Sequence, residues 1–133
     1  MAADPLIDHA ALKRGGLMPQ VTPGLFSLRL RLVAGDLDAS RLRAIADIAQ
    51  RHGNGSVHLT SRQGIEIPFV PLEHIEAVRG ELAAAGLELG ACGPRVRTVT
   101  GCQGAAVCPH GLVETKAICE AIDRHFAGME LPH

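Results

Sequence analysis

The sequence alternates between apolar and polar side chains over residues 25–33, which read LFSLRLRLV. Successive side chains of a β-strand point to opposite faces. One face therefore carries Phe26, Leu28, Leu30 and Leu32, and the other carries Ser27, Arg29 and Arg31. This is the pattern of a half-buried strand. Gly35 follows and ends it.

Working outward from this strand, apolar residues at helical spacing predict a helix over 38–52 that stops at Gly53. Two short alternating stretches follow, near 56–60 and 64–69, joined by the turn SRQG. They predict a hairpin, with Pro68 marking the end of its second strand.

A second apolar stripe predicts a helix over 71–85, with Pro71 at its first position and Gly86 at its end. A short strand could follow at 87–91. The order β-α-β-β-α-β is the ferredoxin-like arrangement, an α+β fold whose helices cover one face of an antiparallel sheet.

The chain then divides into three parts. Residues 1–24 are rich in proline and glycine, so we expect an irregular arm. Residues 25–94 form the ferredoxin-like domain. Residues 95–133 begin a different domain with an extended piece, a cysteine loop at 101–110 and a helix near 111–126.

Composition excludes several classes of partner. Of the 133 residues, 47% are apolar, which is enough for one packed core. Three Phe residues are the only aromatic ones besides histidine and the net charge is −1, which argues against nucleic acid or a membrane surface as partner. No targeting segment and no membrane-spanning apolar run is visible, so the expected location is the cytoplasm.

The polar face of the predicted sheet collects charged and hydrogen-bonding side chains. They are Arg29, Arg31, His58, Thr60 and Glu66, with Arg62 and Gln63 at the adjoining hairpin. Arginine is well suited to binding carboxylates and oxyanions in a bidentate manner. A polar outer face is also the ordinary state of a solvated antiparallel sheet, so both interpretations stay open here.

The segment TGCQGAAVCPHG, residues 100–111, carries Cys102 and Cys108 among small residues. Thiolates in such loops bind iron–sulfur clusters, often beside a proline. A pair of buried free thiols explains the spacing equally well, and zinc held by both cysteines with His110 is a further alternative. Cys92 and Cys119 carry no motif and are expected to be packing residues.

Four short motifs follow one another along the chain. They are GGLMPQ at 15–20, LRLR at 28–31, HLTSRQGIE at 58–66, and RTV at 97–99 running into CQGAAVC at 102–108. Together they resemble the sulfite and nitrite reductase family, whose active site couples sirohaem to a 4Fe-4S cluster. The compact cysteine loop looks like that of the small sulfite reductases.

This resemblance implies a role for each matching position. Arg31 and Arg97 would bind the substrate oxyanion as catalytic residues, and Cys102 and Cys108 would be two of four cluster ligands. Cofactor-binding roles at the sirohaem carboxylates fall to Thr60, Arg62, Gln63 and His58. His58 stands where the family often has arginine, and Glu66 where glutamine is common. The Glu66 carboxylate would repel the sirohaem carboxylates unless it is paired or protonated.

The second cysteine pair of the family, C-x3-C, and its lysine-rich strand are not among these 133 residues. We therefore expect the N-terminal part of a reductase that converts sulfite to sulfide or nitrite to ammonia with electrons from a donor protein. By itself the chain would be inactive and would hold neither cofactor. An exposed apolar patch beside the cysteine loop would favour a homodimer. The alternative is a stand-alone ferredoxin-like module that regulates or that binds a tetrapyrrole or metal.

Overall fold

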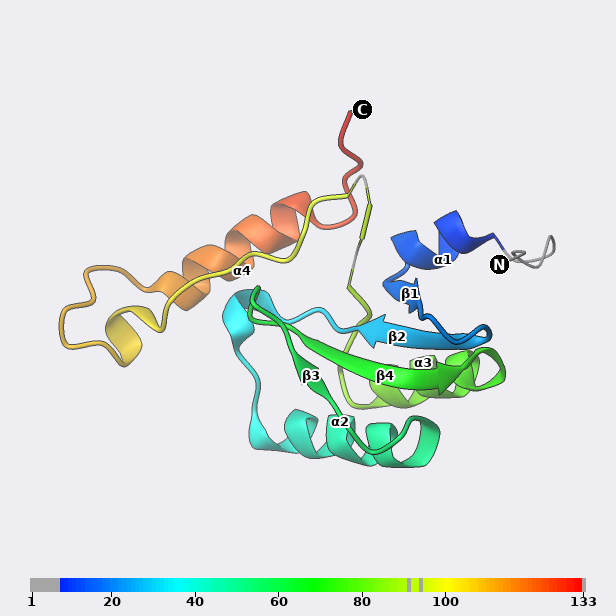
Figure 1. The fold of residues 1–133 in the computed structure, drawn as a ribbon. Coiled ribbons are helices and arrows are strands. Elements are labelled where there is room, and N and C mark those ends of the chain that lie inside the picture. The colour runs from blue at the N-terminus through cyan, green and yellow to red at the C-terminus, as the bar shows by residue number, and fades with distance from the viewer. Residues whose placement is uncertain (1–7, 91, 94, 133) are drawn as a thin grey trace.

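The computed structural model describes residues 8–90, 92–93 and 95–132, and its centre is an antiparallel sheet (Figure 1). The strands lie in the order β1-β2-β4-β3. Their bounds are Leu17–Pro19 for β1, Leu25–Arg29 for β2, His58–Leu59 for β3 and Ile65–Pro71 for β4. Helices α2 (Ala39–His52) and α3 (Ile75–Ala84) cover one face of the sheet, as Figure 1 shows. The predicted ferredoxin-like α+β fold is therefore confirmed.

The core lies between this face and the two helices. Leu28, Ile67, Ile45 and Val78 are fully buried there. Helix α2 begins where the Asp38 carboxylate accepts a hydrogen bond from the backbone N–H of Arg41 at 2.8 Å. Burial of large aliphatic side chains from both layers, at roughly 2 kcal/mol each, holds the helices on the sheet.

The short strand expected over 87–91 is reduced to a single bridge between Leu30 and Leu89, and residue 91 lies outside the described residues. Two hydrogen bonds flank the bridge. The backbone N–H of Arg31 donates to the Glu88 carbonyl at 2.8 Å, and that of Gly90 donates to the Arg29 carbonyl at 2.7 Å. This segment therefore extends the β2 edge that β1 begins.

The irregular arm predicted for residues 1–24 is wrong for residues 9–19. Helix α1 (His9–Arg14) is capped by Asp8, whose carboxylate accepts from the Ala11 N–H at 2.9 Å. Gly16 then turns the chain with a φ of +82°, and a Cβ there would lie 2.5 Å from the Gly90 carbonyl oxygen. After this turn β1 pairs with β2, a non-local contact that the local sequence does not reveal.

Both proline predictions for β4 also need correction. The strand does not end at Pro68, because a bulge places one more residue on β4 than on β2 between the pairs Phe26–Val70 and Leu28–Ile67. Phe69 takes a φ of +61° there. Pro71 is the last strand residue rather than the first helical one, since a 3-10 turn over Leu72–His74 precedes α3.

The last part of the chain packs beside the sheet rather than on its helical layer (Figure 1). It holds a 3-10 turn, η3 (Gly104–Ala106), and helix α4 (Thr115–Phe126), which contacts the 3-10 turn η1 (Val33–Gly35) after β2. Helix α4 starts at Thr115 rather than near residue 111. No helix in the described part of the chain has the length and apolar character to cross a bilayer.

Candidate anion and cofactor site

A cleft of about 170 Å³ opens at the end of β2. Its lining includes Arg29 from β2, Arg62 from the β3–β4 turn and Arg97 from the segment after the domain. Thr60, Ser61 and Thr98 line the same cleft. Arg62 donates to the Thr98 carbonyl at 3.2 Å, which ties the hairpin to that segment. Arginines from three segments line this cleft, which makes it a candidate site for anions.

The structure thus brings together three of the predicted site residues, Thr60, Arg62 and Arg97. Arg31 is not among the lining residues. Its Nη2 lies 2.6 Å from Oδ2 of Asp123 on α4, so its side chain is engaged elsewhere. Strand parity therefore does not bring the Arg31 side chain into this cleft, and its role toward the substrate stays a prediction.

His58 and Gln63 also lie apart from this cleft. His58 is exposed on β3 and is the register partner of Glu66, so it shares the polar face but does not line the cleft. Gln63 instead lines a neighbouring hollow. The cofactor role of each remains a prediction.

Glu66 does have the partner that a carboxylate at this place requires. Its Oε1 accepts from Arg29 Nε at 2.8 Å and lies 2.7 Å from Arg29 Nη2. The Ser27 hydroxyl donates to the other carboxylate oxygen at 3.2 Å. Because Arg29 neutralises Glu66, Arg62 and Arg97 supply the net positive charge of the cleft. Arg29 was missed as a site residue, although its strand parity was the available signal.

The neighbouring hollow is larger, about 420 Å³, and more apolar. Leu37, Leu59 and Ile65 contribute to its walls, and Gln63 and Cys102 also line it. Leu32, Thr60 and Gly64 line both this hollow and the cationic cleft. The two spaces therefore adjoin, and together they suit a ligand with an apolar body and an acidic edge.

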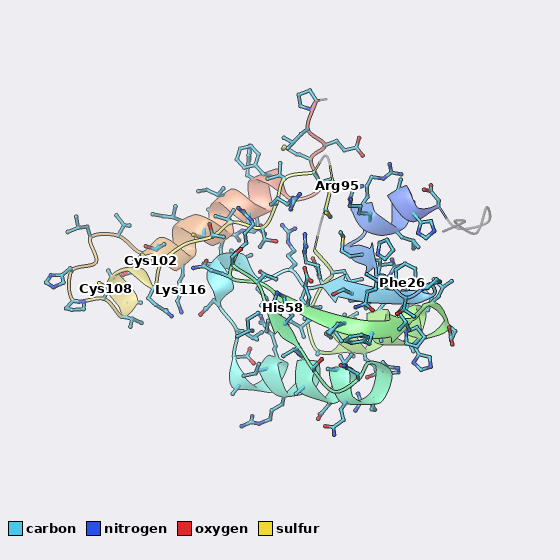
Figure 2. All side chains as sticks on the ribbon, viewed as in Figure 1. Phe26, His58, Arg95, Cys102, Cys108 and Lys116 are labelled. Atoms are coloured by element: carbon cyan, nitrogen blue, oxygen red, sulfur yellow. The ribbon has the colours of Figure 1, made fainter. Side chains whose placement is uncertain are left out.

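The cysteine loop borders this hollow. Figure 2 shows Cys102 and Cys108 on one loop, and both are exposed. The Thr115 hydroxyl lies 3.6 Å from Cys102 Sγ, and its hydrogen bond, aided by the backbone of Gly104, lowers the pKa of the Cys102 thiol. A thiol that ionises more readily is a better metal ligand.

The other cysteines behave as expected for packing residues, since Cys92 and Cys119 are buried. Among residues 8–90, 92–93 and 95–132, no three His, Cys, Asp or Glu side chains converge closely enough to hold a metal ion. The trio of Cys102, Cys108 and His110 is included in that statement, so the zinc alternative finds no support.

Comparison with known proteins identifies the family. The family model for the nitrite/sulfite reductase ferredoxin-like half domain matches residues 18–85. The chain belongs to this family. The matched region spans the four strands from the second residue of β1 onward and both helices of the domain. It ends before Arg97 and the cysteine loop.

Relatives extend the similarity beyond that region. The chain is 36% identical over 121 residues to an uncharacterized protein of Methanocaldococcus jannaschii, covering 91% of this chain and 42% of that protein. It is 33% identical over 111 residues to the NAD(P)H nitrite reductase large subunit of Klebsiella oxytoca, covering 83% and 12%. The chain thus spans less than half the length of each.

A solved structure supports the same fold. The Mycobacterium tuberculosis NirA protein superposes with a TM-score of 0.76 at 22% sequence identity. The superposition covers 88% of this chain and 25% of the other. It therefore includes much of the segment that follows the ferredoxin-like half domain.

Proposed function

We propose that this chain is the N-terminal part of a sirohaem and 4Fe-4S dependent reductase that acts on sulfite or nitrite. The observation that carries the proposal is the adjacency of two spaces: the cleft of Arg62 and Arg97, and the apolar hollow at Cys102. Membership of the nitrite/sulfite reductase family supplies the reaction class. An electron-donor protein and the small oxyanion are the partners that this function requires.

The cationic cleft fits the acidic edge of the tetrapyrrole. Sirohaem carries eight carboxylates, and Arg62 with Thr60 offers charged and neutral donors for them. At about 170 Å³ the cleft is too small for a whole macrocycle, so it would hold an edge. The leucine and isoleucine walls of the adjoining hollow would face the apolar part of the ring.

Arg97 lines the same cleft from a different segment. We assign it to the oxyanion, because a fixed guanidinium stabilises negative charge on oxygen without reorganising during the reaction. When bound, sirohaem and the cluster would supply the redox chemistry of the six-electron reduction, with the electrons coming from the donor protein. The role of Arg97 is to bind and orient the anion beside them.

Cys102 and Cys108 would be two of the four cluster ligands. Their exposure on one glycine-containing loop fits this role, and so does the lowered pKa of Cys102. Two thiolates do not complete a 4Fe-4S site, so the other ligands would come from outside these 133 residues. The isolated chain is accordingly expected to be inactive.

Helix α4 presents an apolar face to solvent. Ile118, Ile122 and Phe126 are 46%, 42% and 41% exposed. We propose that isolated chains associate through this face as a homodimer. Sedimentation at increasing concentration should show dimers, and Ile122→Glu should give monomers throughout. Monomeric unsubstituted chain at all concentrations would contradict this proposal.

The proposed function is tested by titrating the purified chain with sirohaem under anaerobic conditions and following visible absorption. We expect saturable, salt-sensitive binding that is weak enough to be lost on gel filtration. Because Arg62 would bind sirohaem carboxylates, Arg62→Glu should weaken binding by about tenfold or more. Arg43→Glu, with the same charge change on the exposed side of α2, should leave it unchanged.

Haem, which has two carboxylates, provides a second comparison and should bind more weakly than sirohaem. Equal affinity for both, insensitive to Arg62→Glu, would favour a stand-alone tetrapyrrole-binding module instead. Absence of saturable sirohaem binding would count against the cofactor assignment altogether.

A further inference from the structure

Among the described residues, the most buried ionic contact joins the end of β2 to helix α4. Arg31 Nη2 lies 2.6 Å from Asp123 Oδ2, and the two side chains are 15% and 10% exposed. Asp123 is the one buried charged residue in the described part of the chain. Charged groups are buried at this depth only when paired, so the position of Asp123 depends on Arg31.

Asp123 belongs to the inward face of α4. Thr115, Cys119 and Asp123 follow one another at intervals of four residues and therefore share one side of the helix. The Thr115 hydroxyl contacts Cys102 Sγ, and Cys119 Sγ lies 2.6 Å from where a Cβ on Gly101 would be. One helix face thus contacts both the cysteine loop and the arginine at the end of β2.

The surroundings of Arg31 differ from those of the other arginines. Arg31 lines a separate hollow of about 290 Å³ whose charged residues are mostly acidic. These residues are Asp36, Asp38 and Glu120, with Arg41 as the remaining cation. A small anion gains little on that side. The chain neighbours Leu30 and Leu32 do line the cationic cleft, so the backbone of Arg31 runs along it.

We propose that Asp123 is an internal competitor for the oxyanion at Arg31 and sets the anion affinity of the site. This inference rests on the proposed function and extends it: released from Asp123, the Arg31 guanidinium would join Arg97 in binding the oxyanion. A carboxylate offers a guanidinium the same charge and the same oxygen acceptors as sulfite or nitrite. An incoming anion must either displace Asp123 or share Arg31 with a like charge, and both weaken binding.

The contact geometry allows such displacement. The pair has one hydrogen bond, from Arg31 Nη2 to Asp123 Oδ2, rather than the bidentate arrangement that binds a guanidinium most firmly. The long arginine stem can turn about several bonds without moving the strand. Because Asp123 lies on the helix face that touches the cysteine loop, release of Arg31 would also loosen the hold on that loop.

The test uses the full chain, labelled with 15N and 13C, titrated with sodium sulfite at constant ionic strength and followed by NMR. Asp123→Asn keeps the shape of the side chain and removes its charge. We expect this variant to lower the Kd for sulfite by about fivefold or more. In an Arg31→Gln background the same substitution should leave the Kd for sulfite unchanged, because there is then no guanidinium for which Asp123 and sulfite compete.

Asp36→Asn is the matched control. Asp36 lines the same hollow, but its carboxylate lies 2.6 Å from Lys116 Nζ rather than on Arg31. Removal of this charge breaks the ion pair between Asp36 and Lys116 of α4 but leaves Arg31 and Asp123 paired. The Kd for sulfite should therefore stay within about twofold of that of the unsubstituted chain. A drop as large as that of Asp123→Asn would attribute the effect to general charge and overturn the inference.

The unsubstituted chain gives an independent readout if Asp123→Asn does not fold. Saturation with sulfite should shift the 13C signal of the Asp123 carboxylate as the pair opens. If sulfite shifts the amides around Arg62 while that carboxylate signal and the Kd of Asp123→Asn stay unchanged, the inference fails and the proposed function stands. If no amide near the cleft responds to sulfite in any variant, the inference fails together with the oxyanion role of the cleft.

Discussion

Gln63 holds Gly101 with both ends of its side-chain amide. Its Nε2 donates to the Gly101 carbonyl at 2.8 Å, and its Oε1 accepts from the Gly101 N–H at 2.9 Å. The backbone of Gln63 has a left-handed φ of 58°, which is uncommon for residues other than glycine. This contact fixes the residue before Cys102 to the hairpin that carries Arg62.

Loss of that contact should loosen the cysteine loop without unfolding the domain. Gln63→Ala removes two exposed hydrogen bonds, together about 1 kcal/mol. Hydrogen exchange of the Gly101 amide should accelerate by about fivefold or more, while the amides of β4 keep their protection. Gln50→Ala, at an exposed position of α2, serves as the control. Unchanged exchange at Gly101 would show that other contacts hold the loop.

The four thiols should fall into two classes of reactivity. Cys102 and Cys108 are exposed, whereas Cys92 and Cys119 are buried. A thiol-specific reagent should therefore modify two cysteines rapidly in the folded chain and all four after denaturation. Mass spectrometry should locate the rapid modifications at Cys102 and Cys108. Rapid modification of Cys119 would contradict the packing of α4 on the loop.

The reactivity of Cys102 should extend to unusually low pH. The Thr115 hydroxyl and the Gly104 backbone lower the pKa of this thiol. The reactive thiolate is therefore still present at pH values at which an ordinary cysteine is protonated. In a Cys108→Ser background, the alkylation rate of Cys102 should therefore have a midpoint below that of a free cysteine derivative. Thr115→Val should raise this midpoint and Thr115→Ser should retain it. Identical midpoints for both variants would remove Thr115 as the cause.

Stability should depend on the sheet core far more than on the outer face of α4. Leu28 is fully buried, so Leu28→Ala should reduce the free energy of unfolding by about 3 kcal/mol. Ile122 is 42% exposed, and Ile122→Ala should cost less than about 1 kcal/mol. Chemical denaturation at low protein concentration, where the chain is monomeric, measures both. Similar losses for the two variants would mean that α4 packs differently.

Local patterns predicted those parts of the fold that local interactions determine. The alternation around Leu28, the stripe of α2 and the hairpin turn were sufficient for the ferredoxin-like order. Strand β1 was missed because its three residues are defined by pairing with β2, which is not a local property. Helix α1 was missed because six residues carry too little periodicity.

Helix α4 shows a different limit of sequence patterns. The sequence displays an apolar stripe of Ile118, Ile122 and Phe126, yet the buried residues of this helix are Cys119 and Asp123. Hydrophobicity predicted which side chains need covering, but the packing partner within the chain is the cysteine loop and Arg31. A carboxylate is buried here because a guanidinium meets it, and that pairing spans 92 positions of sequence.

The candidate site was predicted in the same uneven way. Motif resemblance singled out Thr60, Arg62 and Arg97, and the β3–β4 turn and the segment after the domain bring these three residues to one cleft. Strand parity failed for Arg31 because β2 ends at Arg29 and the backbone beyond it no longer follows a regular strand. The tie between Gln63 and Gly101 follows from loop geometry, for which the sequence offers no signal.

The central claim is that the arginine cleft and the cysteine loop form one cradle for an acidic tetrapyrrole. NMR mapping with iron-free sirohydrochlorin tests it most directly, because the ligand is diamagnetic and carries the same carboxylates as sirohaem. We predict that the amides of residues 60–64, 97–98 and 101–103 shift together and saturate at one ligand concentration, while those of α3 stay unchanged. Shifts confined to α2 and α3, or separate saturation of the cleft and the loop, would contradict the account.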